Sequence, residues 1–182
     1  MSEQAEDFSI QKSVLELLTV ANELCLFLEK ADEYSKQEIF EYFHKICPLI
    51  YLKGSLISSI DVENPEANER FVTEEQWEYI FNTLRSKLAP DDEFWYIDEQ
   101  RFIDDEVDKG SIAEHFADIY QDLKDYIILY QKNTHAAREN AINNCRILFE
   151  VNWGPKLIRV MKAIHQYLYA DALSGEEGEQ QM

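Results

Sequence analysis

The chain has 182 residues and a formal net charge of −19 at pH 7, from 17 Lys and Arg against 36 Asp and Glu. Its 46% of hydrophobic residues and 13% of aromatic residues exclude general disorder, and only five Gly and four Pro argue against a loop-rich all-β fold. Because phosphate backbones and anionic membranes bind clusters of Lys and Arg, this charge predicts neither a nucleic-acid partner nor a membrane partner.

The two ends of the chain are polar, and the sequence between them predicts one helical domain. We expect a disordered N-terminus over residues 1–8, a helical domain over 9–173 and a disordered acidic tail over 174–182. The acidic N-terminus lacks the apolar stretch of a signal peptide. The most apolar early stretch is too polar to span a bilayer, because it is interrupted by Glu16, Asn22 and Glu23.

The three cysteines, Cys25, Cys47 and Cys145, are odd in number and far apart, without the spacing of a metal or redox motif. Two of them lie in apolar stripes of predicted helices. This pattern indicates buried free thiols in a reducing compartment. We therefore expect a cytoplasmic protein.

The first three predicted helices lie in the N-terminal half of the chain. Apolar residues at helical spacing predict a helix over Ile10–Leu28, with Ser9 as its N-cap. A second helix begins at Ser35, where SKQE has the form of a capping box, and Pro48 is expected to bend or end it. The run TEEQ from Thr73 opens a third helix with one apolar face.

Three further helices are predicted after a long acidic segment. Ser111 opens the fourth with SIAE, and Thr134 can cap the fifth. Gly154-Pro155 is expected to end the fifth helix near Trp153 and to start the sixth, since Pro is favoured in a first helical turn. No segment predicts a strand. The fold class is therefore all-α, a single-domain bundle of about six helices.

The segment Asp91–Gly110 fits neither a helix nor a solvated linker. It contains nine acidic residues together with Phe94, Trp95, Tyr96 and Phe102. We expect a long acidic loop whose aromatic side chains hold it against the bundle. The alternative is a binding loop that meets a basic partner, because long structured loops are often functional.

Four acidic residues recur along one face of the predicted fourth helix at spacings of four, four and three: Glu114, Asp118, Asp122 and Asp125. Repulsion at such spacings costs a few tenths of a kcal/mol per pair. Residues 91–125 hold thirteen acids against three bases, a net charge of −10. A metal ion is not expected here, because a straight stripe spreads its carboxylates along the helix axis.

Two explanations of this acidic stripe remain open. In the favoured one, cations of the neighbouring helices neutralise the carboxylates; the candidates are Lys156, Arg159 and Lys162 on the sixth helix and Arg138 and Arg146 on the fifth. In the other, the charged side chains form a groove that binds a polar ligand.

Sequence motifs for catalysis and for metal binding are weak. Glu41 and His44 form one E-x-x-H, but a di-iron bundle needs a second, and no other His has a Glu three residues before it. Walker, GxGxxG, HExxH and GxSxG motifs do not occur. We therefore predict no catalytic residue, no metal site and no cofactor.

Three runs resemble a family of uncharacterised bacterial helical proteins, known mainly from Bacteroidetes, that carries a domain-of-unknown-function label. The runs are PLIYLKGSL (48–56), ADIYQDLKDYI (117–127) and FEVNWGPKLI (149–158), and the similarity spans about Val14 to Tyr169. The resemblance implies an intracellular all-α domain. It brings no known activity and no catalytic residue.

Two functional hypotheses follow. The first is a non-enzymatic interaction module that docks a basic partner through its acidic surface between Asp91 and Asp125. The second is a small-ligand-binding or enzymatic bundle with a polar site among the fourth, fifth and sixth helices, formed by Asp118, Asp122, Arg146, Arg159 and His165. The candidate ligand or partner residues are Glu114, Asp118, Asp122, Asp125, Arg146 and Arg159.

Overall fold

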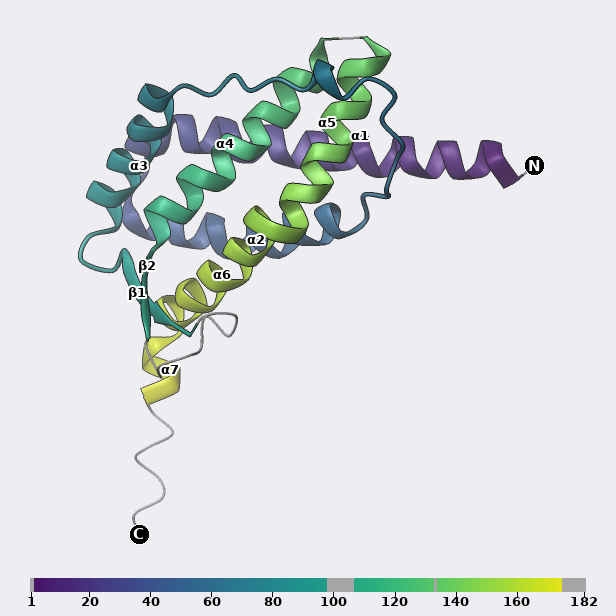
Figure 1. Ribbon diagram of the computed structural model, residues 1–182. Coiled ribbons are helices and arrows are strands. Elements are labelled where there is room, and N and C mark those ends of the chain that lie inside the picture. Colours follow the sequence, from purple (N-terminus) through teal and green to yellow (C-terminus); the bar gives the residue numbers. More distant parts are fainter. Residues whose placement is uncertain (1, 98–106, 133, 175–182) are drawn as a thin grey trace.

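The structure is a computed structural model that describes residues 2–97, 107–132 and 134–174 (Figure 1). Residues 175–182 of the predicted disordered tail lie outside the described residues. So do residues 98–106 of the predicted acidic loop, which include Phe102.

The described chain is almost entirely helical, and the predicted all-α class is confirmed. The helices are α1 (Ser2–Glu29), α2 (Lys36–Ser55), α3 (Glu74–Leu88), α4 (Ile112–Gln131), α5 (His135–Leu148), α6 (Gly154–Leu168) and the short α7 (Ala170–Ser174). Two 3₁₀ turns, Ala31–Glu33 and Pro65–Ala67, and one π-helical turn, Phe149–Trp153, lie between them. Strands β1 (Glu93–Tyr96) and β2 (Asp108–Ser111) form the one described sheet.

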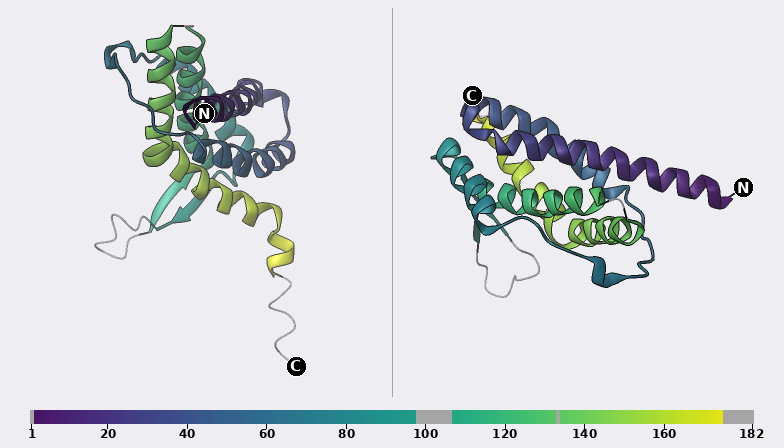
Figure 2. Two further views of the ribbon diagram at one scale, coloured as in Figure 1. Left: turned by 90° about the vertical axis from the view of Figure 1, so that its right-hand side faces the viewer. Right: turned by 90° about the horizontal axis from the view of Figure 1, so that it is seen from above.

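Helix α4 is the centre of the bundle. It contacts α1, α3, α5 and α6, and in the view from above it lies between α1 on one side and α5 on the other (Figure 2). Within α4 up to Tyr130, Glu114 is the one exposed residue. Its apolar side chains join the core, where the ring of Phe116 stacks on Phe43 of α2 with 3.6 Å between centroids. Most side chains of α4, including acidic ones, are therefore buried or half-buried.

The helix starts predicted from capping residues are largely confirmed. Ser35 and Thr73 each form a complete capping box with the residue three positions later. The hydroxyls of Ser111 and Thr134 accept the backbone N–H of the third residue of α4 and of α5. These contacts are local, so the sequence alone determines them.

One predicted helix start is wrong, and one of the two outcomes expected at Pro48, the end of the helix, does not occur. Helix α1 begins at Ser2, so Ser9 lies inside it and does not cap it. Helix α2 continues through Pro48 to Ser55. The buried face of α2 continues after the proline with Ile50 and Gly54, and this packing outweighs the cost of about 3 kcal/mol of an interior proline.

The junction of α5 and α6 is a tight π-helical turn, and no break separates the two helices. Its last residue, Trp153, is fully buried, and its indole N–H donates to the carbonyl of Cys145 at 3.1 Å. The ring lies on Gly54 of α2, where a Cβ would be 2.3 Å from the ring atom Cη2. Trp153 therefore fills the corner between three helices, and a residue with a Cβ at position 54 would collide with its ring.

The predicted acidic loop is in part a β-hairpin. Strand β1 pairs antiparallel with β2 in a register that places Phe94 opposite Gly110 and Tyr96 opposite Asp108. The side chains of β1 alternate, so that Phe94 and Tyr96 pack edge-on against His115 while Trp95 points outward. The prediction of no strand is therefore wrong, because four residues are too short for the alternation to stand out.

Candidate functional site

The acidic stripe of α4 faces other parts of the protein along most of its length. Asp122 and Asp125 are 4% and 3% exposed, Asp118 is half-buried, and Glu114 alone is exposed. Like charges in the interior are costly unless each is paired or hydrogen-bonded. Each buried or half-buried carboxylate of the stripe has such partners.

Asp118 joins α4 to two other helices. Its Oδ2 accepts from the ammonium of Lys156 on α6 at 2.6 Å, and its Oδ1 accepts from the indole N–H of Trp77 on α3 at 2.9 Å. The predicted neutralisation by the sixth helix is therefore correct for Lys156. The indole donor of Trp77 was not foreseen.

Asp122 is a buried carboxylate of the stripe with a shifted pKa. Burial raises its pKa, while a hydrogen bond from Asn152 at 2.6 Å and the charges of Arg70 and Lys156 oppose that rise. The guanidinium of Arg70 lies 3.5 Å from Oδ1. Asn152 belongs to the π-helical turn, so Asp122 fastens α4 to the junction of α5 and α6.

Asp125 fastens a long loop to α4. Its Oδ1 accepts the backbone N–H groups of Phe71 at 2.7 Å and of Val72 at 2.9 Å, and Arg70 lies 3.7 Å from Oδ2. These residues end the loop over residues 56–73, which crosses α4 and α5 in Figure 1. A second anchor is Asn140 of α5, whose amide donates to the carbonyl of Asn64 at 2.8 Å. The carboxylates of Asp122 and Asp125 therefore act as structural clamps.

The other candidate residues do not converge on one site. Arg146 pairs with Glu150 on its own helical segment at 2.8 Å, and the guanidinium of Arg159 lies 4.4 Å above the ring of Tyr96. His165 is exposed and packs on Tyr169 at 4.7 Å between ring centroids. Asp118 and Asp122 lie with Lys156 and Asn152. Among the described residues, no hydrogen bond or ion pair joins Asp118 or Asp122 to Arg146 or His165.

The half-motif on α2 is also explained by packing and solvent. Glu41 accepts from Gln37 at 2.9 Å, and His44 lies 3.4 Å from the hydroxyl of Tyr169. Among residues 2–97, 107–132 and 134–174, no group of three or more His, Cys, Asp or Glu could hold a metal ion. Cys47, close in sequence to His44, is buried, and burial raises its pKa.

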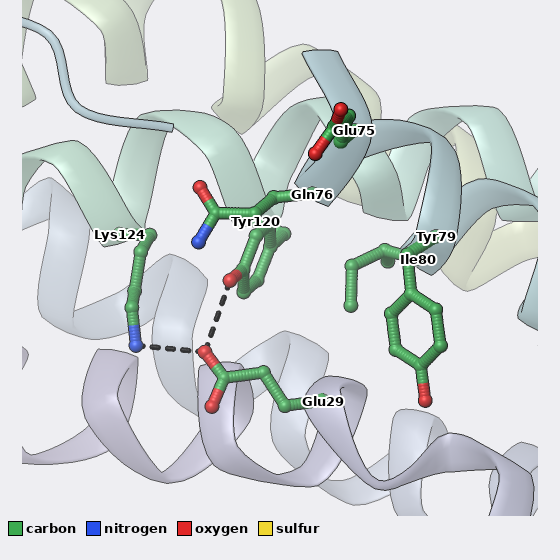
Figure 3. Close-up of a pocket in the computed structure, with 7 residues that line it drawn as sticks. All are labelled: Glu29, Glu75, Gln76, Tyr79, Ile80, Tyr120 and Lys124. Carbon is green, nitrogen blue, oxygen red and sulfur yellow. Dashed lines mark hydrogen bonds and ion pairs between the residues drawn. The ribbon is translucent and has the colours of Figure 1, made fainter. Parts of the chain in front are cut away.

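A surface pocket of about 390 Å³ lies between the end of α1, the start of α3 and the middle of α4 (Figure 3). Its lining residues are Glu29, Glu75, Gln76, Tyr79, Ile80, Tyr120 and Lys124. The hydroxyl of Tyr120 and the ammonium of Lys124 both donate to the same oxygen, Oε1 of Glu29, at 2.9 and 2.7 Å. Sequence reasoning missed this pocket, because its residues come from three helices and form no motif.

Three further observations bear on the class of protein. No helix in the described part of the chain is long and apolar enough to cross a membrane. A family model described as a domain of unknown function, DUF5063, matches residues 8–170. No curated protein matches the chain.

A solved structure shares the fold. It is the crystal structure of a Bacteroides fragilis protein that is 35% identical, with a TM-score of 0.75, over 86% of this chain and 92% of that one. The match of the family model and this similarity confirm the resemblance seen in the three sequence runs.

Proposed function

We propose that this chain, which belongs to the DUF5063 family, is a non-enzymatic protein-interaction module that docks a basic partner through its acidic surface. The family description assigns no activity, so the proposal rests on charge and geometry. The net charge of −19 favours encounters with cationic surfaces and opposes encounters with anionic ones.

The docking surface that we propose is on α3 and not on the acidic stripe of α4. Asp122 and Asp125 are buried and hold their own structural partners, so they are not accessible to another protein. The first two turns of α3 carry Glu74, Glu75 and Glu78, all exposed. These three residues define the acidic face of α3.

The pocket in Figure 3 borders this face through Glu75 and Tyr79, and it is the observation that carries the proposal. Both hydrogen bonds to Glu29 end on Oε1, so among the described residues Oε2 is left as an acceptor for an incoming donor. Tyr79 is 49% exposed and offers an aromatic face to a cation. A Lys or Arg side chain of the partner would lie between these two groups.

The proposal places the protein in the cytoplasm. Cys25, Cys47 and Cys145 are all buried as free thiols. Buried thiols without disulfide partners are typical of proteins from a reducing compartment. A basic partner from the same compartment is therefore the expected binding class.

The test is binding of a fluorescent octalysine peptide, followed by anisotropy. The variant Glu74→Gln, Glu75→Gln, Glu78→Gln removes three charges from α3. The matched control Asp61→Asn, Glu63→Gln, Glu66→Gln removes three charges from the exposed loop over residues 56–73.

We expect the α3 variant to weaken binding about tenfold and the loop variant about threefold or less, because the α3 charges act at contact distance. Equal weakening by both variants would show that only net charge matters and would refute the assignment to α3. Circular dichroism of both variants checks that the helices persist.

A further inference from the structure

The outward face of α2 changes character along the helix. Its first half carries exposed carboxylates, those of Glu38 and Glu41. Its second half and its end carry Leu49, Leu52 and Leu56, which are 40%, 53% and 48% exposed. Spacings of three and four residues place these leucines on one side of the helix. The three leucines define the apolar stripe of α2.

The apolar stripe lies on the outside of the bundle. Helix α2 packs against α1 and α6, and Figure 2 shows α1 and α2 side by side at one edge of the bundle. The core face of α2, which includes Phe43, Ile46 and Ile50, points away from the stripe. Single exposed apolar residues are normal on protein surfaces, but a contiguous stripe marks a contact with another molecule more often.

The segment that carries the stripe is free of acidic residues. Residues 42–60 contain no Asp or Glu, whereas 36 of the 182 residues of the chain are acidic. Lys45 is exposed, and Lys53 pairs with Glu16 of α1 at 2.9 Å, so the carboxylate that approaches this part of α2 is neutralised. On a chain of net charge −19, the stripe is therefore a surface where another acidic molecule meets little local repulsion.

A second copy of the chain meets the requirements of this surface. A two-fold contact places the same surface of both molecules face to face, so that surface must complement itself. An apolar stripe does so, whereas the acidic face of α3 would set like charges against each other. A basic partner, by contrast, would find no carboxylate within residues 42–60 with which to pair.

We propose that the chain forms a two-fold symmetric dimer in which the apolar stripe of α2 packs on the stripe of a second copy. Leu52 lies between Leu49 and Leu56, so the two-fold axis would pass near it and the two Leu52 side chains would meet. A contact centred on one helix face is small, and small interfaces associate weakly, so we expect a dissociation constant of about 10–100 µM. The dimer does not involve α3 and is independent of the docking proposed above.

The experiment is sedimentation velocity of the full chain from about 5 to about 500 µM, a range that brackets the expected dissociation constant. It is run at about 50 mM and about 500 mM NaCl, where electrostatic screening differs strongly. We expect a monomer–dimer equilibrium that is tighter at the higher salt, because salt screens the repulsion between two chains of charge −19. Binding of a basic peptide to α3 would instead weaken with salt, so the two proposals can fail separately. A chain that stays monomeric at every concentration in both buffers, or a dimer that weakens with salt, would overturn the proposal.

Variants at exposed positions locate the contact. Leu52→Glu should weaken dimerisation at least about tenfold, because two carboxylates would then face each other across the axis. Leu52→Lys should weaken it as strongly, although this substitution makes the net charge of the chain less negative. The matched control is Leu26→Glu, at a leucine of α1 that is 48% exposed, and it should leave the dissociation constant within about twofold.

Two results with these variants would overturn the assignment to α2. If Leu26→Glu weakens dimerisation as much as Leu52→Glu does, net charge alone controls the association. If Leu52→Lys strengthens dimerisation, repulsion between the chains and not the apolar contact determines the equilibrium. Circular dichroism of each variant checks that the helices persist.

Discussion

The clamp formed by Asp125 gives the sharpest prediction for stability. The substitution Asp125→Ala removes the acceptor of two backbone N–H groups, those of Phe71 and Val72. Hydrogen bonds to a charged acceptor contribute about 1.5–3 kcal/mol each. Because both amides are only partly buried and water can replace part of the lost bonding, we expect a smaller total loss of about 2–4 kcal/mol in the free energy of unfolding. For a chain of this length that corresponds to a fall in Tm of about 6–12 °C.

Urea denaturation followed by circular dichroism measures this loss directly. The control is Glu114→Ala, which removes an exposed carboxylate from the same helix and should cost about 0.5 kcal/mol. If Asp125→Ala costs no more than the control, the carboxylate does not hold the loop over residues 56–73. The stripe would then need a functional explanation.

Three further predictions concern packing, pH and charge. Gly54→Ala should destabilise by about 1–3 kcal/mol in urea denaturation, because its Cβ would lie 2.3 Å from the ring of Trp153. Burial lowers the pKa of His115 from 6.5 to about 4, so the unfolded chain takes up the proton first and stability should fall as pH falls from 6.5 toward 4. Urea denaturation of the wild type and of His115→Gln over that pH range measures the effect. The free energy of unfolding of the wild type should fall by up to about 3 kcal/mol more than that of the variant. Lys156→Gln should cost about 1 kcal/mol in urea denaturation, since it removes the cation beside the half-buried Asp118.

Each of these predictions has an outcome that contradicts it. An unchanged free energy of unfolding in Gly54→Ala would mean that the corner filled by Trp153 can widen without loss. A pH profile of His115→Gln that matches the wild type would assign the acid sensitivity to other groups. A Lys156→Gln variant as stable as the wild type would leave the indole of Trp77 as the effective partner of Asp118.

The features that the sequence predicted well are local ones. Ser35, Thr73, Ser111 and Thr134 cap helices through residues three positions away, so a short window contains all the information. The pairing of the stripe with α6 was also predictable for Lys156. It required only that cations at helical spacing lie beside carboxylates at helical spacing.

The features that the sequence did not predict depend on contacts between distant segments. The partners of Asp125 are backbone N–H groups, which every non-proline residue carries and which leave no signature in a sequence. Pro48 remains helical because the core on either side of it outweighs its local cost. The pocket around Glu29 is lined by residues of three helices that are far apart in the sequence, so it can be found only once the packing of these helices is known.

The way Asp125 holds the loop over residues 56–73 also bears on hydrogen exchange. The amides of Phe71 and Val72 bind a carboxylate that belongs to the most buried helix of the bundle. Their exchange with solvent deuterium therefore requires the loop to detach from α4, whereas exposed amides without such an acceptor exchange without any opening. The protection factors of these two amides therefore measure local unfolding. They give the fraction of time that the loop is detached from α4 while the rest of the bundle stays folded.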